Sequence, residues 1–407
     1  MNEQFYMSNL PYYEIPTPVK TVLAVFGAHG YRAYIVGGAV RDIMRGAPVH
    51  DWDVATETPP ELTKQLFCEY PVYDTGLKHG TVTVNVDGEL IEITTFRTDG
   101  EYKDSRHPEN VMFTDSLYED LERRDFTINA MALNLYKDLE DPFRGMRDLA
   151  NNEICAVGVP LDRFAEDALR IMRAYRFSAT LLYTIEEKTL EATSICAYRL
   201  EYISRERINE EWKKILTAPF CSKAIVTMKK YGIFTFIFPG LKLDPEYLKD
   251  LEKLPPIYTL RSAAFFKNCP DDKFAEASSR INFTKNEATE VKSILEAYRS
   301  LVSDPDQLLR RFCYRYGKLA EYAALIAEHD LLVPARILPE VRAILSDAGM
   351  IWSRKDLKIN GNDIISRYNL PRRSLSDITE ALVLLVVDQK VENEREALLS
   401  AIENIIE

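Results

Sequence analysis

The sequence predicts an α+β domain at the N-terminal side, followed by a long all-helical region. Two observations lead to this prediction. Strand-like and helix-like apolar patterns alternate over about the first 150 residues, and strand patterns fade after position 155, where amphipathic helical spacing continues to the C-terminus. A chain of 407 residues is also too long for one small core, so several domains are expected.

The N-terminal region begins with a helix signal and continues with strand signals. Positions 17–29 have helical apolar spacing, and Thr17 and Pro18 suit the first turn of a helix. Short strands are predicted at 33–36, 51–55, 81–86 and 90–96. The third of these alternates with a period of two, which is typical of a strand with one buried face.

Two connections between strands are informative in themselves. Asp87-Gly88 is a dipeptide that favours a tight hairpin turn. The polar stretch 97–112 lacks periodicity, and a loop of this length is uncommon in a compact domain unless it has a function. We therefore expect a long mobile loop with a functional role there.

Amphipathic helices follow one another after position 155, separated by breaks that contain proline or glycine. They are predicted at 163–178, 184–198, 205–217, 221–231, 285–302, 305–318, 320–331, 375–389 and 393–406. A further break near 350–360 separates a smaller helical tail from the rest.

Composition limits the possible classes of protein without choosing among them. Hydrophobic residues make up 46% of the chain and charged residues 28%, as in a globular protein. The net charge of −12 argues against indiscriminate nucleic-acid binding but allows a local basic strip. We expect no membrane partner, because no apolar run is long enough to cross a bilayer. The six cysteines are scattered without a CxxC pair, so we expect no zinc site and a cytoplasmic location.

A glycine pair follows the first predicted strand. Gly37 and Gly38 let the backbone approach a phosphate, and the helix that begins after them offers free N–H groups. Arg41, in the first turn of that helix, can add a charge-assisted contact. This turn is weak evidence alone, and the acidic residues that follow strengthen it.

Asp51 and Asp53 are two residues apart on a predicted strand, so their carboxylates should share one face. Like charges held this close repel each other unless a cation lies between them, and Mg²⁺ prefers such oxygen ligands. A solvated strand end is the alternative. The preceding glycine turn favours a two-metal site that activates a hydroxyl and stabilises a leaving pyrophosphate.

Glu92 is the candidate for a third carboxylate of this site. It lies within a run of apolar and β-branched residues, where an unpaired carboxylate is costly. The alternative is an exposed residue on an edge strand.

The segment 123–129 (RRDFTIN) is predicted to open the next helix. Arg123 and Arg124 beside a helix start suit a triphosphate. Asp125 could instead cap that helix, and Asn129 could hold backbone or a sugar, so capping and ligand contact remain equal alternatives.

Taken together, these motifs resemble one family. GGAVRD, DWD, EITTFR, RRDFTINAMALN and EDALRIMRAYRF resemble the class II tRNA nucleotidyltransferases, which include CCA-adding enzymes, CC- and A-adding relatives and bacterial poly(A) polymerases. The resemblance is dense over about 30–217. It implies a polymerase-β-type head with a five-stranded sheet, followed by an all-α neck, body and tail. The implied bounds are 1–155, 156–220, 221–350 and 351–407.

The resemblance also implies roles for individual residues. Asp51 and Asp53 would bind Mg²⁺, and together with Glu92 would form the catalytic centre. The nucleotide would be bound by Gly38, Arg41, Arg124, Asp167, Arg170, Arg173 and Arg176. The loop 97–112, with Arg106-His107-Pro108, resembles the loop that the family uses for adding the terminal A.

Asp167 and Arg170 also have a physical interpretation. Three residues apart on the predicted helix 163–178, they would share a face. Cytosine and adenine each present an amino donor beside a ring-nitrogen acceptor, which match an accepting aspartate and a donating arginine. Uracil and guanine present the opposite pattern, and each buried mismatch costs roughly 1–3 kcal/mol. Arg173 and Arg176 drift around the helix and are expected to contact phosphate or brace the neck.

Basic residues of the body and tail could follow RNA phosphates. The candidates are Arg311, Arg315, Arg354 and Lys358. A solvated charged surface is an equal alternative for all four.

The function that these features imply is addition of C, C and A to the 3′ end of tRNA from CTP and ATP, without a template. The alternatives are an A-adding or CC-adding tRNA nucleotidyltransferase, a poly(A) polymerase, and a non-catalytic RNA-binding protein with a relic active site.

Overall fold

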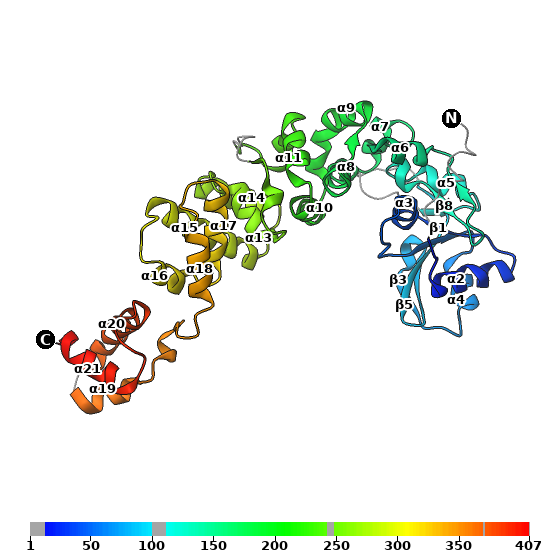
Figure 1. Ribbon diagram of the computed structural model, residues 1–407. Coiled ribbons are helices and arrows are strands. Elements are labelled where there is room, and N and C mark those ends of the chain that lie inside the picture. The colour runs from blue at the N-terminus through cyan, green and yellow to red at the C-terminus, as the bar shows by residue number, and fades with distance from the viewer. Residues whose placement is uncertain (1–12, 100–110, 242–247, 369–370, 407) are drawn as a thin grey trace. The chain divides into compact units, whose positions relative to one another are not determined.

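The computed structural model describes residues 13–99, 111–241, 248–368 and 371–406. The chain forms two compact units. The first contains Met1–Lys249 and Ser279–Asn282, and the second contains Asp250–Ser278 and Phe283–Glu407. The α+β class with a helical C-terminal region is confirmed (Figure 1).

A mixed sheet forms the centre of the N-terminal region, with strand order β3-β4-β5-β2-β1-β8-β9. Its strands are β1 (Ala33–Val36), β2 (Asp53–Thr56), β3 (Val72–Gly76), β4 (Thr81–Val86), β5 (Glu89–Thr95), β8 (Ala132–Leu133) and β9 (Leu139–Glu140). β2 and β5 pair in parallel, and the other neighbours pair antiparallel. The expected five strands correspond to β3, β4, β5, β2 and β1. The sheet has seven because two strands of two residues each extend it.

The hairpin between β4 and β5 confirms the turn that was predicted at Asp87-Gly88. Their φ angles are 53° and 92°, and positive values at both central positions are required by the hairpin turn that matches strand twist. The predicted loop 97–112 is partly wrong, because its ends pair as β6 (Arg97–Asp99) and β7 (Val111–Phe113). Arg106, His107 and Pro108 lie outside the described residues.

One face of the sheet is apolar across the four neighbouring strands β4, β5, β2 and β1. Ile35, Val54, Ile93 and Val82 lie side by side in register and are at most 1% exposed. The helices α2 (Thr17–Ala28) and α4 (Pro60–Leu66) pack on this part of the sheet (Figure 1). This face therefore supplies much of the core of the N-terminal region.

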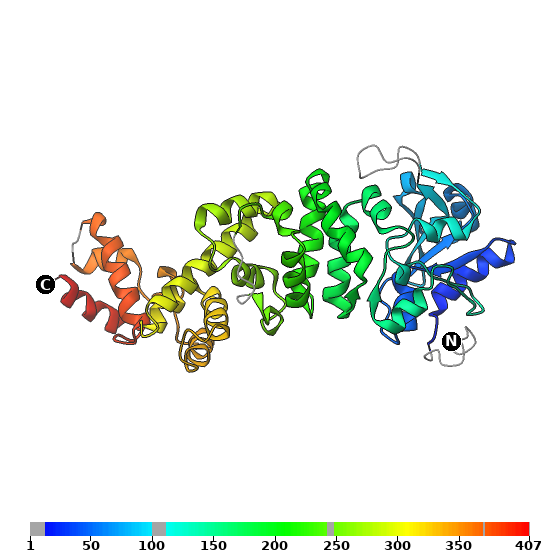
Figure 2. The same ribbon diagram turned by 90° about the horizontal axis from the view of Figure 1, so that it is seen from above.

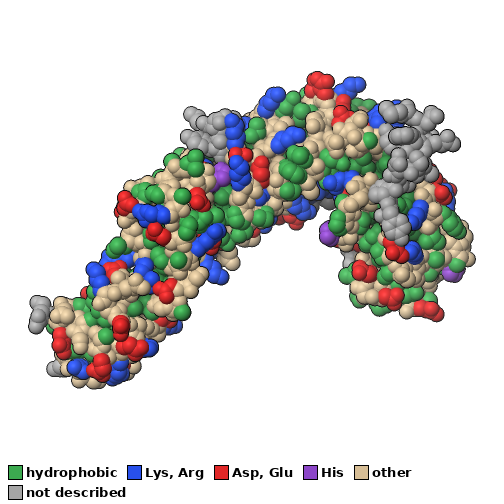
Figure 3. All heavy atoms as spheres, viewed as in Figure 1, with side chains coloured by type: hydrophobic (Ala, Val, Ile, Leu, Met, Phe, Trp, Pro, Cys, Tyr) green, Lys and Arg blue, Asp and Glu red, His purple; other side chains and the backbone are tan. Residues whose placement is uncertain are grey.

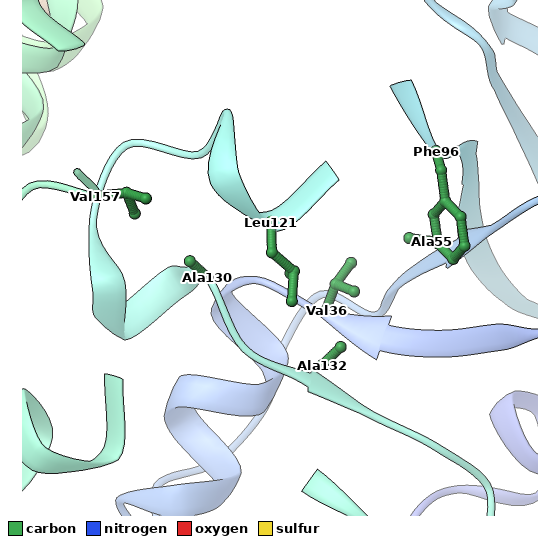
Figure 4. Close-up of a cluster of buried hydrophobic side chains, with 7 residues drawn as sticks. All are labelled: Val36, Ala55, Phe96, Leu121, Ala130, Ala132 and Val157. Atoms are coloured by element: carbon green, nitrogen blue, oxygen red, sulfur yellow. The ribbon is translucent and has the colours of Figure 1, made fainter. Parts of the chain in front are cut away.

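The opposite face is only partly covered. A cluster of Val36, Ala55, Phe96, Leu121, Ala130, Ala132 and Val157 is buried there. In Figure 4, Leu121 of α5 (Leu117–Glu122) points toward Val36 and Ala132 on the sheet. The rest of this face carries the polar residues of the candidate site.

Helices continue the first unit. They are α3 (Gly38–Met44), α6 (Gly145–Asn151), α7 (Pro160–Glu166), α8 (Leu169–Leu181), α9 (Glu187–Cys196), α10 (Arg205–Thr217), α11 (Cys221–Lys230) and α12 (Phe234–Ile237), with 3-10 turns η1 (Leu77–His79), η2 (Thr127–Asn129) and η3 (Ala197–Tyr202). A short parallel pair joins β10 (Glu153–Ile154) and β11 (Thr184–Ile185). α8 packs against α10 and α11, which are drawn in green in Figure 2.

The predicted helix 163–178 is wrong in one respect that matters for function. It consists of α7 and α8, separated at Asp167, whose φ of −138° and ψ of 103° are extended. Asp167 is therefore not in a helix, and it does not share a helical face with Arg170.

The regular elements that the structure describes in the second unit are all helices or 3-10 turns. Its elements are α13 (Tyr258–Phe266), α14 (Asp271–Arg280), α15 (Lys285–Ser303), α16 (Leu309–Tyr316), α17 (Leu319–His329), α18 (Ile337–Leu345), α19 (Gly361–Tyr368), α20 (Leu375–Val387) and α21 (Arg395–Ile406), with η5 (Leu251–Lys253), η6 (Arg354–Asp356) and η7 (Arg372–Ser374). Within the described residues, no helix combines the length and apolarity needed to cross a membrane.

Candidate active site

Strand register brings two of the predicted acids together. Asp53 of β2 is the direct partner of Glu92 in the parallel strand β5. Partners in register point to the same face of a sheet. Thr83 of β4 continues the row on the other side of Glu92. The polar face of the sheet thus presents two adjacent carboxylates from strands that are far apart in sequence.

Glu92 is a site candidate on different grounds from those that the sequence suggested. It is exposed, so the burial cost that marked it as a candidate is absent. It is not an edge residue either, because β5 lies between β4 and β2. Its adjacency to Asp53 is what makes it a site candidate.

Asp51 is exposed and precedes β2, which begins at Asp53 rather than at 51. The expected strand alternation therefore does not extend to it. The two other acids still act on Asp53. Burial, the charge of Glu92 and the charge of Asp51 raise the pKa of Asp53, and Arg124 partly opposes this shift.

The three acids form an open arrangement. Among the described residues, the His, Cys, Asp and Glu side chains include one trio with ligand atoms all within 4.8 Å of one another, and this trio is Asp148, Glu153 and Cys155. Asp51, Asp53 and Glu92 are more widely spread.

The glycine turn next to these acids is required by close packing at Gly37. Its φ is 71°, which L side chains rarely adopt, and it caps α3. A Cβ atom at Gly37 would lie 3.2 Å from Nη1 of Arg124 and 3.8 Å from Oδ2 of Asp53. At Gly38 a Cβ atom would make an ordinary contact, 3.5 Å from Nη2 of Arg41. The first glycine is thus the one that lets Arg124 and Asp53 approach the turn.

Arg123 and Arg124 follow a helix instead of opening one, which corrects the prediction for 123–129. They come directly after α5, and the next helical element is the short turn η2. Asp120 is buried and accepts hydrogen bonds from Arg123 at 2.6 Å and from Arg124 at 3.0 Å. Burial alone would raise the pKa of Asp120, but the two arginines outweigh it and the pKa is lowered. Nε of Arg124 is buried without a hydrogen-bond partner among the described residues.

Asp125 links the sheet region to α8. Its Oδ1 accepts from the N–H of Phe126 at 2.8 Å and from Nδ2 of Asn129 at 3.2 Å. Its Oδ2 accepts from Nε of Arg173 at 2.7 Å. Burial opposes ionisation, but Arg173 and Asn129 outweigh it, so the pKa of Asp125 is lowered.

The link continues to the glycine turn. Oδ1 of Asn129 accepts from Nη1 of Arg41 at 2.9 Å. A connected path therefore runs from Arg41 on α3, through Asn129 and Asp125, to Arg173 on α8. Sequence reasoning left Asp125 and Asn129 between capping and ligand contact, and the structure shows that they join two elements.

Three arginines surround the ring of Phe177 on α8. The guanidinium carbons of Arg41, Arg173 and Arg176 lie 5.3, 5.6 and 4.0 Å from the ring centre. Cations over an aromatic face are attracted by its quadrupole. Nε of Arg176 also donates to Glu211 of α10 at 2.6 Å, which braces α8 against α10. Phe177 was not singled out from the sequence.

Asp167 and Arg170 are each held by the protein. Oδ1 of Asp167 accepts from the N–H of Leu169 at 3.0 Å, and Oδ2 accepts from Nη2 of Arg207 at 2.7 Å. Arg170 is 8% exposed and donates to Glu166 at 2.6 Å. It also donates to the backbone oxygens of Arg163 and Arg123, at 3.2 and 2.8 Å.

The predicted RNA-binding residues are mostly paired with acids. Arg311 donates to both oxygens of Asp388, at 2.8 and 2.6 Å. Arg354 donates to Glu380 at 3.1 Å, and Lys358 forms an ion pair with Glu394. Arg315 is exposed and has no ion-pair partner among the described residues. On the face shown in Figure 3, basic and acidic side chains are interspersed over the C-terminal helices.

Comparison with known protein families identifies two parts of the chain. Residues 33–155 match a family described as the poly A polymerase head domain. Residues 183–244 match a family described as "Probable RNA and SrmB- binding site of polymerase A". The first match contains the glycine turn, the acids and Arg124. The second contains Arg207 and the helices that pack on α8.

Curated relatives match along nearly the whole chain. A CCA-adding enzyme from Streptococcus suis is 35% identical over 395 residues, covering 95% of this chain and 96% of the relative. One from Streptococcus gordonii is 37% identical over 396 residues, covering 94% and 95%.

Solved structures have the same fold. The Bacillus stearothermophilus CCA-adding enzyme in complex with CTP has a TM-score of 0.79 and 29% identity, covering 96% of this chain and 98% of that one. The Thermotoga maritima CCA-adding enzyme complexed with tRNA has a TM-score of 0.72 and 19% identity, covering 100% and 99%. At its lower identity, the second similarity concerns the fold alone.

Proposed function

The chain belongs to the family of CCA-adding enzymes, and we propose that it adds C, C and A to the 3′ end of tRNA from CTP and ATP, releasing pyrophosphate. The observation that carries this proposal is the pairing of Asp53 with Glu92 beside Gly37 and Arg124. The CCA-adding relatives and the solved complex of one such enzyme with CTP support these substrates.

Divalent metal ions are used by nucleotidyltransferases generally, and we propose Mg²⁺ here, held by Asp51 and Asp53 next to Glu92. The residues fit this ion in two ways. Carboxylate oxygens are the ligands that Mg²⁺ prefers. Burial and the charges of Glu92 and Asp51 also raise the pKa of Asp53, which is expected where several acids gather at a site for a cation. The bound ions would activate the 3′-hydroxyl of the RNA and neutralise charge on the leaving pyrophosphate.

The arginines of the site are proposed to bind the triphosphate. Arg124 carries Nη1 to the glycine turn, 3.2 Å from a Cβ atom built at Gly37, where its guanidinium can contact an anionic group. Arg41 lies at the turn that Gly37 and Gly38 form, where the backbone can approach a phosphate. Holding the nucleotide in one orientation accounts for much of the rate in such reactions, since positioning and electrostatic stabilisation dominate phosphoryl-type transfer.

Base selection is proposed to depend on Asp167 and Arg170. Aspartate accepts and arginine donates, which matches the pairing edges of cytosine and adenine. Asp167 lies at the extended break before α8 and Arg170 lies in the first turn of α8, and this closeness in the chain supports the proposal. Arg173 and Arg176 are proposed to position α8, through Asp125 and Glu211.

The remaining parts are proposed to bind tRNA. We assign residues 1–155 to catalysis, 156–220 to nucleotide recognition, and 221–350 and 351–407 to tRNA contact. Arg315 can bind a phosphate directly, whereas Arg311, Arg354 and Lys358 must first leave their acidic partners. The six free cysteines agree with a reducing compartment, and we propose a cytoplasmic location.

One assay separates this function from its alternatives. tRNA that lacks CCA is incubated with CTP alone, with ATP alone and with both nucleotides. We expect two C residues with CTP alone and a complete CCA end with both. A long A tail with ATP alone would identify a poly(A) polymerase, and addition of A only to tRNA ending in CC would identify an A-adding enzyme. Addition of CC without a following A would identify a CC-adding enzyme.

The same assay tests the metal site. Asp51→Ala should abolish incorporation and leave tRNA affinity near that of the unaltered protein, because Asp51 is exposed and supports no core packing. Full activity in this variant would reject the assignment of Asp51. No incorporation by the unaltered protein would favour an RNA-binding protein with a relic site.

A further inference from the structure

The carboxylate of Asp167 is held from two sides. The residue lies between α7 and α8 with extended backbone. Oδ1 binds the N–H of Leu169 in the first turn of α8. Oδ2 binds Nη2 of Arg207 at 2.7 Å, and Arg207 lies 40 positions later on α10. The side chain therefore cannot rotate without breaking a hydrogen bond at one oxygen.

Arg207 is itself placed by a rigid helix. α10 buries Ile208, Trp212, Ile215 and Leu216 within the first unit. One turn after Arg207 on the same helix, Glu211 accepts from Arg176 of α8. α10 thus makes two ionic contacts with the α7–α8 segment, one through a donor and one through an acceptor.

The two contacts differ in what they leave unpaired. Nη1 of Arg207 is buried and has no hydrogen-bond partner among the described residues. A buried donor without an acceptor costs roughly 1–3 kcal/mol, so the fold holds Arg207 against Asp167 at a cost in stability. The Arg176–Glu211 contact joins only the two helices, through Nε of Arg176.

Base selection requires a carboxylate with a fixed direction, and the hydrogen bond from Arg207 fixes the direction of Asp167. A carboxylate discriminates cytosine and adenine from uracil and guanine only as an acceptor with a fixed direction. Arginine has donors and no acceptor, so its bond to Oδ2 is made by the accepting form of Asp167. Without this bond the carboxylate could rotate and meet either base edge.

We propose that Arg207 is a positioning residue for base selection, which holds Asp167 in the accepting orientation that excludes uracil and guanine. The proposal rests on the proposed role of Asp167 in reading the base. It assigns to α10 a part in specificity in addition to its structural contact with α8.

The test compares nucleotide selectivity in four variants. Incorporation of CTP and of UTP into tRNA lacking CCA gives the ratio of kcat/KM for the two nucleotides. Arg207→Met keeps much of the side-chain volume and removes every donor. We expect this ratio to fall about tenfold, the scale of one lost discriminating hydrogen bond. Arg207→Lys, which keeps the charge without the planar fork, should recover part of the selectivity.

Glu211→Gln is the matched structural control. It weakens the other ionic contact between α10 and α8, so it should lower the temperature of unfolding and leave the CTP to UTP ratio unchanged. Asp167→Asn is the positive control and should relax selectivity at least as much as Arg207→Met.

The results distinguish a failure of the proposed role of Arg207 from a failure of the proposed role of Asp167. If Asp167→Asn relaxes selectivity and both Arg207 variants retain it within about twofold, the role of Arg207 is overturned and that of Asp167 stands. Equal changes in Glu211→Gln and Arg207→Met would show a purely structural contact and would also overturn it. If Asp167→Asn leaves selectivity intact, the base-reading role fails, and the inference for Arg207 fails with it.

Discussion

Replacing Arg173 with methionine breaks the path that joins α8 to the sheet region. Arg173 donates to Oδ2 of Asp125 through Nε at 2.7 Å and forms an ion pair with it through Nη2 at 2.6 Å. The side chain of Asp125 is 8% exposed, and that of Arg173 is 35% exposed. Arg173→Met leaves a buried carboxylate oxygen with neither of these donors.

The expected cost follows from these contacts. Removing one partner of a fully buried ion pair costs about 3–5 kcal/mol. Here the loss is smaller, because Arg173 is partly solvated and because Oδ1 of Asp125 keeps its bonds from Phe126 and Asn129. We expect a decrease of about 2–3 kcal/mol in the free energy of unfolding.

Urea unfolding followed by circular dichroism measures this decrease. Lys64→Met is a control in the same unit, because Lys64 pairs with Asp74 at 3.1 Å and their side chains are 31% and 52% exposed. Such a surface pair contributes under about 1 kcal/mol. If Arg173→Met costs no more than Lys64→Met, the buried link between α8 and the sheet region does not stabilise the fold as argued.

Three further predictions follow from the same geometry. The pKa of Asp125 is lowered in the folded state, so its contribution to stability is complete above the ordinary value of 3.8 and is lost as the pH falls through the lowered value; Asp125→Asn should remove this part of the acid dependence in urea titrations at low pH. Gly37→Ala should destabilise the fold by about 1–3 kcal/mol, since its φ of 71° is strained for alanine and the added Cβ approaches Arg124; a cost near zero in thermal unfolding would contradict the role of this turn. Mg²⁺ should raise the unfolding temperature of the unaltered protein more than that of Asp53→Asn at equal ionic strength, and equal shifts would count against Asp53 as a ligand.

Local patterns in the sequence were sufficient for much of the fold. The strands at 33–36 and 81–86 have the predicted bounds, because the short apolar run of the first and the alternation of the second are visible without knowledge of any partner. The helix predicted at 205–217 also has the predicted bounds, since its apolar spacing reflects a single buried face.

The break at Asp167 was missed because no proline or glycine marks it. Apolar spacing continues from α7 into α8, while the Asp167 side chain binds the N–H of Leu169 and competes with regular helix. An aspartate two residues before a helix start is a known capping signal, and it was available in the sequence.

The geometry of the site depends on contacts between distant segments. β2 and β5 are neighbours in the sheet but not in the chain, so the pairing of Asp53 with Glu92 could not be derived from either strand alone. Arg207 was missed as a partner of Asp167 for the same reason. The resemblance to a family pointed to the acids as a group in one region, but the pairing of Asp53 with Glu92 is a matter of strand register.

The most direct test is single-turnover transfer of CMP from CTP to tRNA lacking CCA, by Asp53→Asn and by the unaltered protein at saturating Mg²⁺. We predict a loss of about a thousandfold in rate or more, because removing a metal ligand forfeits several kcal/mol of charge stabilisation in the transition state. tRNA affinity, measured by filter binding, should change by less than about threefold, a small free-energy difference. A rate within tenfold of the unaltered protein, with normal tRNA affinity, would contradict the assignment of the paired strand acids to catalysis.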